Sequence, residues 1–235
     1  MALLKAIKNN IPNAITCLNL LCGALAIVVS FEPFEGTSVF GLQGYQLAFV
    51  FLALAAVADF CDGLVARLLH AVSPLGKELD SLSDCVSFGL APAMILYNVM
   101  TEARCPSWMC YMSMMIPIFG ALRLARFNID TNQATTFTGL PIPANAIFWI
   151  GFINYYATHH SISQWIVLTL IVVMSLLMVC NLRMFSLKIH NFSLKENFRQ
   201  YTLLIASIAF IVLAGVSGFA CVVLFYVIVS ALFRE

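Results

Sequence analysis

Long apolar stretches, separated by short turns rich in polar residues, proline or glycine, run the whole length of the chain. They lie at about residues 14–31, 44–58, 85–100, 107–122, 144–158, 164–180, 202–216 and 218–233. With its flanking turns, each stretch is long enough to cross about 30 Å of hydrocarbon as an α-helix. The alternating ten-residue segments typical of membrane barrels are not found. The pattern predicts an all-α, polytopic membrane protein with about eight transmembrane helices.

Composition supports a membrane protein without a soluble part. Hydrophobic residues make up 62% of the chain and charged residues only 10%, which is outside the range of ordinary soluble domains. The chain has no linker and no low-complexity tract. We therefore expect a single integral-membrane domain over residues 1–235, with core spans within about 12–182 and two extra spans at about 200–233.

Positive charges gather on one side of the predicted helices. When loops are assigned alternately to the two sides, eleven of the 12 Lys and Arg residues fall together and only Arg104 lies opposite. Positively charged loops stay in the cytoplasm, so both termini and the loops at 67–77, 123–140 and 183–199 are predicted to be cytoplasmic. The net charge of +1 comes without a basic patch interleaved with aromatic residues, which argues against a nucleic-acid partner.

Four aspartates stand in or beside two apolar stretches, where a charge is costly. Asp59 and Asp62 are three residues apart, and Asp80 and Asp84 are four apart, so each pair projects from one helix face. An aspartate at the centre of a membrane helix costs roughly 2.5–3.5 kcal/mol, so a partner is expected. Two opposed pairs make an oxygen cage for two divalent ions that share a diphosphate, Mg²⁺ or Mn²⁺ first and Ca²⁺ as a further candidate.

Small residues and an arginine accompany the aspartates. Gly63, Ala66 and Gly76 let a ligand or a neighbouring helix approach the backbone, and helix packing alone explains any one of them. Arg67, one helical turn after Gly63, offers a fork of donors suited to phosphate.

Together these residues form the pattern D-x2-D-G-x2-A-R-x8-G-x3-D-x3-D between Asp59 and Asp84. This pattern resembles the signature of the CDP-alcohol phosphotransferase family, with every fixed position filled. The segment Pro12-Asn13-Ala14-Ile15-Thr16 is similar to the family's Pro-Asn-x-x-Thr element. Within the family, segments 87–93, 122–128 and 139–144 resemble bacterial and archaeal CDP-diacylglycerol-serine O-phosphatidyltransferases.

The resemblance implies transfer of a phosphatidyl group from CDP-diacylglycerol to the hydroxyl of L-serine, giving phosphatidylserine and CMP with the help of divalent metal. It implies that all four aspartates ligate two metal ions and that Asp84 is also the general base. The residues implied to bind the CDP-lipid are Asn13, Thr16, Gly63, Ala66, Arg67 and Ser73. It further implies a homodimer, surrounded by membrane lipids in the inner membrane of a prokaryote. The cytoplasmic assignment of the loop at 67–77 predicts an active site that faces the cytoplasm.

The acceptor needs charge recognition of its own, because serine carries a carboxylate and an ammonium group. Arg123 and Arg126, three residues apart at the end of an apolar stretch, are candidates for the serine carboxylate or a substrate phosphate. Asn128 in the same segment is a further candidate. Anchoring by positive charge, or contact with lipid headgroups, explains the two arginines equally well.

Three other functions remain open from the sequence. The acceptor could instead be glycerol 3-phosphate or inositol phosphate, because the aspartate pattern does not choose between alcohols. A cation transporter would use intramembrane carboxylates as an ion path, but it would spread them over the membrane depth, whereas these four lie near one face. A structural scaffold would leave the four aspartates without a purpose.

Overall fold

A computed structural model describes residues 2–32, 41–129, 137–159, 162–185 and 197–232, with backbone alone for residues 2–9 and Phe137. Almost all of these residues are helical, and the all-α class is confirmed. The chain divides into two compact units, Met1–Pro117 and Ile118–Glu235, which are described one at a time. The expectation of one domain over the whole chain stays a prediction.

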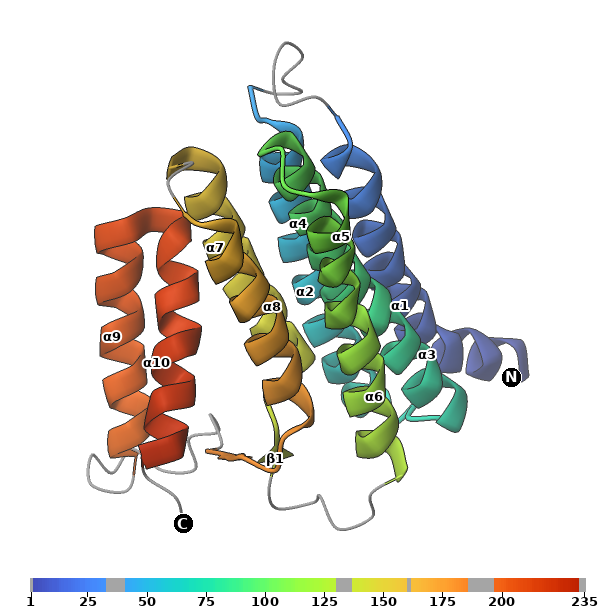
Figure 1. Cartoon of the computed structure of the whole chain (residues 1–235). Helices are drawn as coiled ribbons and strands as arrows, with labels where there is room; N and C mark the ends of the chain where they lie inside the picture. Colours follow the sequence, from blue (N-terminus) through green and yellow to red (C-terminus); the bar gives the residue numbers. More distant parts are fainter. Residues whose placement is uncertain (1, 33–40, 130–136, 160–161, 186–196, 233–235) are drawn as a thin grey trace. The chain divides into compact units, whose positions relative to one another are not determined.

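The first unit is built on two long helices that pack along each other, α1 (Ala2–Ser30) and α2 (Gly44–Leu68) (Figure 1). Close approach at one end depends on Gly44, where a Cβ would lie 2.6 Å from the Val29 carbonyl oxygen. The other face of α1 packs against α3 (Pro74–Asp84), the π-helical turn η1 (Cys85–Leu90) and α4 (Ala91–Glu102). These three elements form one continuous helix that runs back along α1.

Local sequence signals explain where α3 begins. The Ser73 hydroxyl accepts a hydrogen bond from the Gly76 N–H at 3.0 Å, and Pro74 occupies the first turn, as is usual for a helix start. His70 has a positive φ of 51° in the preceding turn. After α4, the short helix α5 (Ser107–Tyr111) and a 3₁₀ turn (Met112–Met114) lead into α6 (Met115–Ile129), which carries the chain into the second unit.

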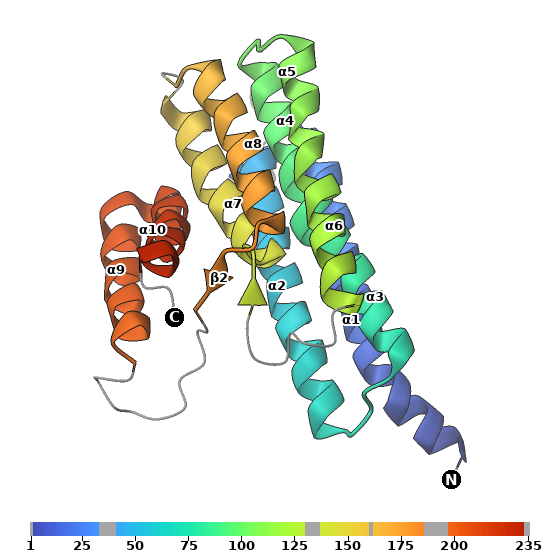
Figure 2. The ribbon, with the colours of Figure 1, turned by 60° about the horizontal axis from the view of Figure 1, so that its bottom comes forward.

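The second unit contains most of α6, then α7 (Ile142–His159), α8 (Gln164–Val179), α9 (Phe198–Ala214) and α10 (Gly218–Leu232). Two short strands, β1 (Phe137–Thr138) and β2 (Arg183–Met184), pair antiparallel, Phe137 opposite Met184, next to the ends of α7 and α8 (Figure 2). α10 packs against both α7 and α9. A hydrogen bond of 2.9 Å from Asn154 to Ser217 ties α7 to the 3₁₀ turn between α9 and α10.

Several helices are long and apolar enough to cross a bilayer. Within the described ranges there are five such stretches, Asn10–Ser30, Gly44–Leu68, Pro74–Glu102, Ser107–Ile129 and Phe198–Leu232. The 3₁₀ turn Gly215–Ser217 divides the last of them into α9 and α10, which pack against each other (Figure 1). α7 and the shorter α8 are apolar as well, so each of the eight predicted stretches falls on a helix. The number of crossings and the side of each terminus stay predictions.

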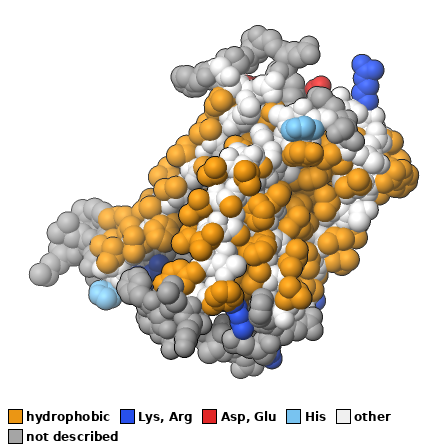
Figure 3. Space-filling view, turned by 90° about the vertical axis from the view of Figure 1, so that its left-hand side faces the viewer, with side chains coloured by type: hydrophobic (Ala, Val, Ile, Leu, Met, Phe, Trp, Pro, Cys, Tyr) orange, Lys and Arg blue, Asp and Glu red, His pale blue; other side chains and the backbone are white. Residues whose placement is uncertain are grey.

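Apolar side chains point outward in the way that a lipid environment allows. On α9, Ile205 is 69% exposed, Val212 77% and Leu213 83%. Figure 3 shows many hydrophobic side chains at the surface that it views. A soluble protein rarely exposes so large an apolar surface. A polytopic membrane protein accounts for it, because lipid covers this surface.

Candidate active site

Three predicted aspartates meet between α2 and α3. One carboxylate oxygen from each of Asp59, Asp62 and Asp80 lies within 4.8 Å of the others. Asp84 follows Asp80 by one helical turn and is close enough to interact with both Asp59 and Asp80. The structure therefore brings all four predicted side chains together, with Asp84 beside the group of three.

Local helix geometry explains this meeting. Residues three or four apart share a helix face, so α2 presents Asp59 with Asp62 and α3 presents Asp80 with Asp84. Both pairs lie near the same end of the first unit, because α2 ends at Leu68 and α3 begins at Pro74. The clustering near one end disfavours a cation path that crosses the membrane depth.

The cluster lacks donors for several buried oxygens. Asp62 Oδ2, Asp80 Oδ1 and Asp84 Oδ1 are buried without a hydrogen-bond partner, and Asp62 is only 6% exposed. Carboxylates so close together repel each other strongly where the dielectric constant is low. Oxygen-rich, anionic sites of this kind suit divalent cations such as Mg²⁺ or Mn²⁺. The residues present thus fit a divalent metal.

A cavity of about 240 Å³ opens beside the carboxylates, between α1, α2 and the start of α3. Its lining includes all six residues that were predicted to bind the CDP-lipid: Asn13, Thr16, Gly63, Ala66, Arg67 and Ser73. Asp62 and Asp80 also line it, so the cavity adjoins the proposed metal ligands directly. Residues from sequence positions as distant as Asn13 and Ser73 are thereby assembled into one pocket.

Two glycines keep this cavity open. At Gly76, a Cβ would lie 3.1 Å from Asn13 Oδ1 and 3.2 Å from Ser73 Oγ, so a larger residue would crowd two polar groups of the lining. At Gly63, the nearest group to a Cβ would be Arg67 Nη2 at 3.9 Å. The guanidinium of Arg67 therefore lies back along α2, over Gly63, where it faces the cavity.

Lys77 was missed by the sequence analysis, although it lines the same cavity. It directly follows Gly76 in the aspartate pattern and adds a second cation to Arg67. A positive residue between a small residue and a metal-ligand aspartate was the signal that could have identified it.

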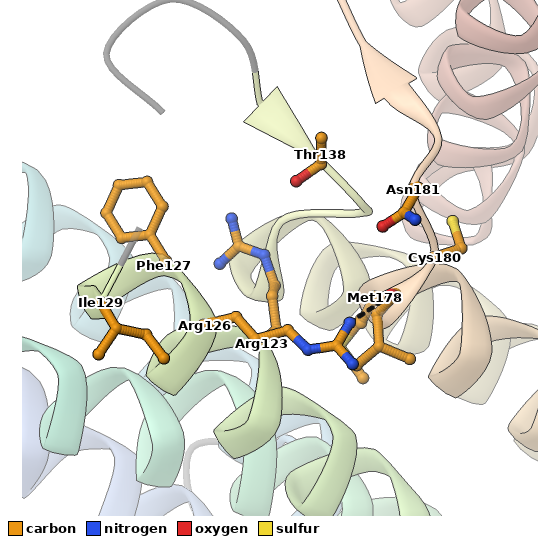
Figure 4. Close-up of a pocket in the computed structure, with 9 residues that line it drawn as sticks. Arg123, Arg126, Phe127, Ile129, Thr138, Met178, Cys180 and Asn181 are labelled. Atoms are coloured by element: carbon orange, nitrogen blue, oxygen red, sulfur yellow. Dashed lines mark hydrogen bonds between the residues drawn. The ribbon is translucent and has the colours of Figure 1, made fainter. Parts of the chain in front are cut away.

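A second cavity of about 340 Å³ lies in the second unit, at the ends of α6 and α8. Its lining includes the predicted residues Arg123 and Arg126, together with Thr138 of β1 and Asn181 beyond α8 (Figure 4). Arg126 Nη1 donates a hydrogen bond of 2.9 Å to the Val179 carbonyl oxygen. The Arg123 guanidinium carbon lies 6.0 Å from the Phe127 ring centroid, and the guanidinium extends in the direction of Thr138 (Figure 4).

The third acceptor candidate stands apart from this cavity. Asn128 belongs to α6 but is not among the lining residues. Residues two positions apart in a helix point about 200° away from each other around the helix axis. Asn128 therefore projects away from the face that carries Arg126. Thr138 and Asn181, which do line the cavity, were missed because they are distant in sequence and each lies alone in its segment.

Comparison with known proteins places these features in a family. The family model for CDP-alcohol phosphatidyltransferases matches residues 9–178. A Helicobacter pylori protein named CDP-diacylglycerol-serine O-phosphatidyltransferase is 33% identical over 206 residues, covering 83% of this chain and 85% of the relative. A Mycobacterium tuberculosis protein with the same name is 31% identical over 236 residues, which cover 94% of this chain and 74% of the relative. A Bacillus subtilis protein with that name is 38% identical over 135 residues, which cover 57% of this chain and 70% of the relative.

Proposed function

Because this chain belongs to the CDP-alcohol phosphatidyltransferase family, we propose that it transfers the phosphatidyl group of CDP-diacylglycerol to the hydroxyl of L-serine. The observation that carries this proposal is the carboxylate cluster, with oxygens within 4.8 Å of one another, beside a cavity lined by Arg67 and Lys77. The names of the relatives support serine as the acceptor. The products are phosphatidylserine and CMP.

Positive charges bind the diphosphate of the substrate in this proposal, from metal ions on the aspartates and from two basic side chains. Asp59, Asp62, Asp80 and Asp84 would hold two divalent ions, because three of them have buried oxygens without a donor. Such ions, when bound, neutralise the diphosphate and the charge that develops on the departing CMP. Arg67 and Lys77 approach the same cavity and supply donors to phosphate oxygens.

The nucleotide part occupies the cavity between α1 and α3. Asn13 and Ser73 present polar groups to it, and Gly63, Ala66 and Gly76 leave room beside the backbone. Side-chain amides and hydroxyls can pair with base or ribose, whereas small residues let a flat ring approach a helix. Each of these contacts accords with the family resemblance of the aspartate pattern.

Asp84 serves as the general base in this proposal. The serine hydroxyl oxygen attacks the lipid-side phosphorus, and the bond from that phosphorus to the bridging oxygen of CMP breaks. CMP departs with the bridging oxygen, and Asp84 accepts the hydroxyl proton. Asp84 is the candidate for this role because it lies beside the group formed by Asp59, Asp62 and Asp80 and not within it, and a base must reach the proton that it removes.

The cavity in the second unit supplies candidates for acceptor recognition. Arg123 and Arg126 offer guanidinium donors to the serine carboxylate, and Thr138 and Asn181 add neutral polar groups. Asn128 stays a candidate only through its place in the segment 122–128. Two arginines would also suit an acceptor that carries phosphate, so glycerol 3-phosphate and inositol phosphate belong in any assay of the acceptor.

Cellular placement forms the remaining part of the proposal. The asymmetry of basic residues supports a site that faces the cytoplasm of a prokaryote, in its inner membrane. A homodimer is implied by the resemblance, and α2 has exposed apolar side chains, such as Phe60 at 66%, that a second copy or lipid could cover. Cross-linking in native membranes tests the dimer.

The experiment that tests the function measures CMP release from CDP-diacylglycerol by the purified protein in mixed micelles. Serine, glycerol 3-phosphate, inositol phosphate and no alcohol are compared, each with Mn²⁺, Mg²⁺ or a chelator. We expect release that needs both serine and metal. Stimulation by another alcohol but not by serine would overturn the acceptor, and release unaffected by chelator would overturn the metal assignment.

A further inference from the structure

Two serines fasten the helix that carries Asp80 and Asp84 onto α1. Ser83 Oγ donates to the Thr16 carbonyl oxygen at 3.2 Å, and Ser87 Oγ donates to the Asn19 carbonyl oxygen at 3.0 Å. Both serines are fully buried and stand four residues apart, on one face. The π-helical turn η1 begins directly after Asp84, so the fastening lies on both sides of this residue.

Asn19, on the α1 side of this contact, is a polar residue to which the proposed reaction assigns no role. It is 0% exposed, and neither its amide nitrogen nor its amide oxygen has a hydrogen-bond partner that meets standard geometry. Its side chain is nevertheless close enough to the Asp84 carboxylate to interact with it. An amide buried among membrane helices without partners is costly, so a role at the neighbouring site is the economical explanation.

Asn98, in the same unit, is an asparagine whose amide has a structural role. Its Nδ2 donates to the Ser30 carbonyl oxygen at 3.0 Å and to Ser30 Oγ at 2.9 Å, which links α4 to the far end of α1. The amide of Asn98 is therefore used within the fold. The amide of Asn19, by contrast, has no such partner in the fold, and it lies close to a carboxylate whose own Oδ1 is buried without a partner.

We propose that Asn19 is a positioning residue, whose amide N–H holds one oxygen of the Asp84 carboxylate so that the other meets the hydroxyl of the acceptor. This inference rests on the proposed role of Asp84 as the base. A general base must stand within hydrogen-bond reach of the proton that it removes, and a carboxylate free to rotate would meet this condition only part of the time. Ser87 fixes Asn19 itself, because it binds the Asn19 backbone carbonyl.

The test compares Asn19→Leu, which keeps a similar volume and removes both amide groups, with the matched control Asn98→Leu. For each full-length variant, kcat, the KM for serine and metal-dependent affinity for CDP-diacylglycerol are measured on the folded fraction. Removing a partner that orients a site carboxylate typically costs 10- to 100-fold in activity. We expect kcat of Asn19→Leu to fall by about that factor, with lipid affinity within about threefold of the parent protein, whereas Asn98→Leu loses thermal stability and keeps its kcat.

Other results would overturn the inference. If kcat of Asn19→Leu stays within about threefold of the parent, or falls no further than that of Asn98→Leu, Asn19 does not position the base. If Asn19→Leu does not fold, Asn19→Ala, which also removes the N–H and adds no charge, replaces it. Asp84→Asn serves as the reference, because its turnover must fall if Asp84 is the base. Normal turnover in Asp84→Asn rejects the proposed role of Asp84, whereas normal turnover in Asn19→Leu alone rejects only this inference.

Discussion

Replacing Gly23 with alanine tests whether close contact between α1 and η1 sets the position of Asp84. A Cβ at Gly23 would meet the Ser87 hydroxyl oxygen directly and would lie 2.7 Å from Ser87 Cα. Because Ser87 Cα belongs to the backbone of a continuous helix, no rotation of a side chain relieves the contact. The two helices must move apart, and the hydrogen bond from Ser87 to the Asn19 carbonyl, 3.0 Å long, is lost or lengthened.

Opposing effects decide the size of the change. Alanine in place of glycine within a helix gains up to about 1 kcal/mol. Overpacking a tight contact costs roughly 1–3 kcal/mol, and loss of a buried hydrogen bond adds about 0.5–1.5 kcal/mol. The steric cost wins, and we expect Gly23→Ala to lower the free energy of unfolding by about 1–3 kcal/mol, with a parallel loss of turnover as Asp84 shifts.

Gly63→Ala supplies the matched control, because it makes the same change in the neighbouring helix α2 where the nearest group, Arg67 Nη2, would be 3.9 Å away. Thermal unfolding in one detergent, followed by circular dichroism, measures both variants beside the parent protein. We expect Gly23→Ala to unfold at a lower temperature and Gly63→Ala to unfold at the same or a higher one. Equal unfolding temperatures for the two variants would refute the packing argument.

Three further outcomes follow from the structure. Gly139→Ala places alanine at φ 75° with its Cβ 3.0 Å from the Met178 carbonyl carbon, so about 2 kcal/mol or more of stability should be lost in thermal unfolding; an unchanged midpoint contradicts this. Arg123→Gln should raise the serine KM roughly 10- to 100-fold through loss of a charge-assisted hydrogen bond, whereas Arg104→Gln should leave it unchanged; equal values in both variants would remove Arg123 from acceptor binding. Asp80→Asn should weaken metal-dependent binding of CDP-diacylglycerol, and an unaltered metal titration would exclude Asp80 as a ligand.

The long apolar stretches were sufficient to predict the helices, and local spacing was sufficient to predict the pairing of aspartates. Residues three or four apart share a helix face whatever the tertiary structure, so Asp59 with Asp62, and Asp80 with Asp84, could be assigned from spacing. Six of the residues that line the cavity between α1 and α3 could also be named from the sequence, because the family resemblance implies them.

Features that depend on contacts between helices distant in sequence could not be predicted from the sequence. Asn19 and Ser87 are brought together only when α3 and η1 pack on α1, and no spacing in the sequence links them. A lone asparagine within an apolar run was a signal, since a polar group in a membrane helix needs a partner. The π-helical turn after Asp84 has no sequence pattern of its own. Asn128 was grouped with Arg126 by proximity in sequence, although helical geometry separates the two faces.

The most direct test of the proposed reaction follows the hydroxyl oxygen of serine. L-Serine labelled with ¹⁸O at its hydroxyl is incubated with the purified protein, CDP-diacylglycerol and Mn²⁺. The isotope content and the amount of both products are then measured by mass spectrometry. Attack by serine on the lipid-side phosphorus predicts one ¹⁸O atom in the phosphodiester of phosphatidylserine and none in CMP, with equal amounts of the two products. Label in CMP, or formation of phosphatidic acid without labelled phosphatidylserine, would contradict the proposed transfer.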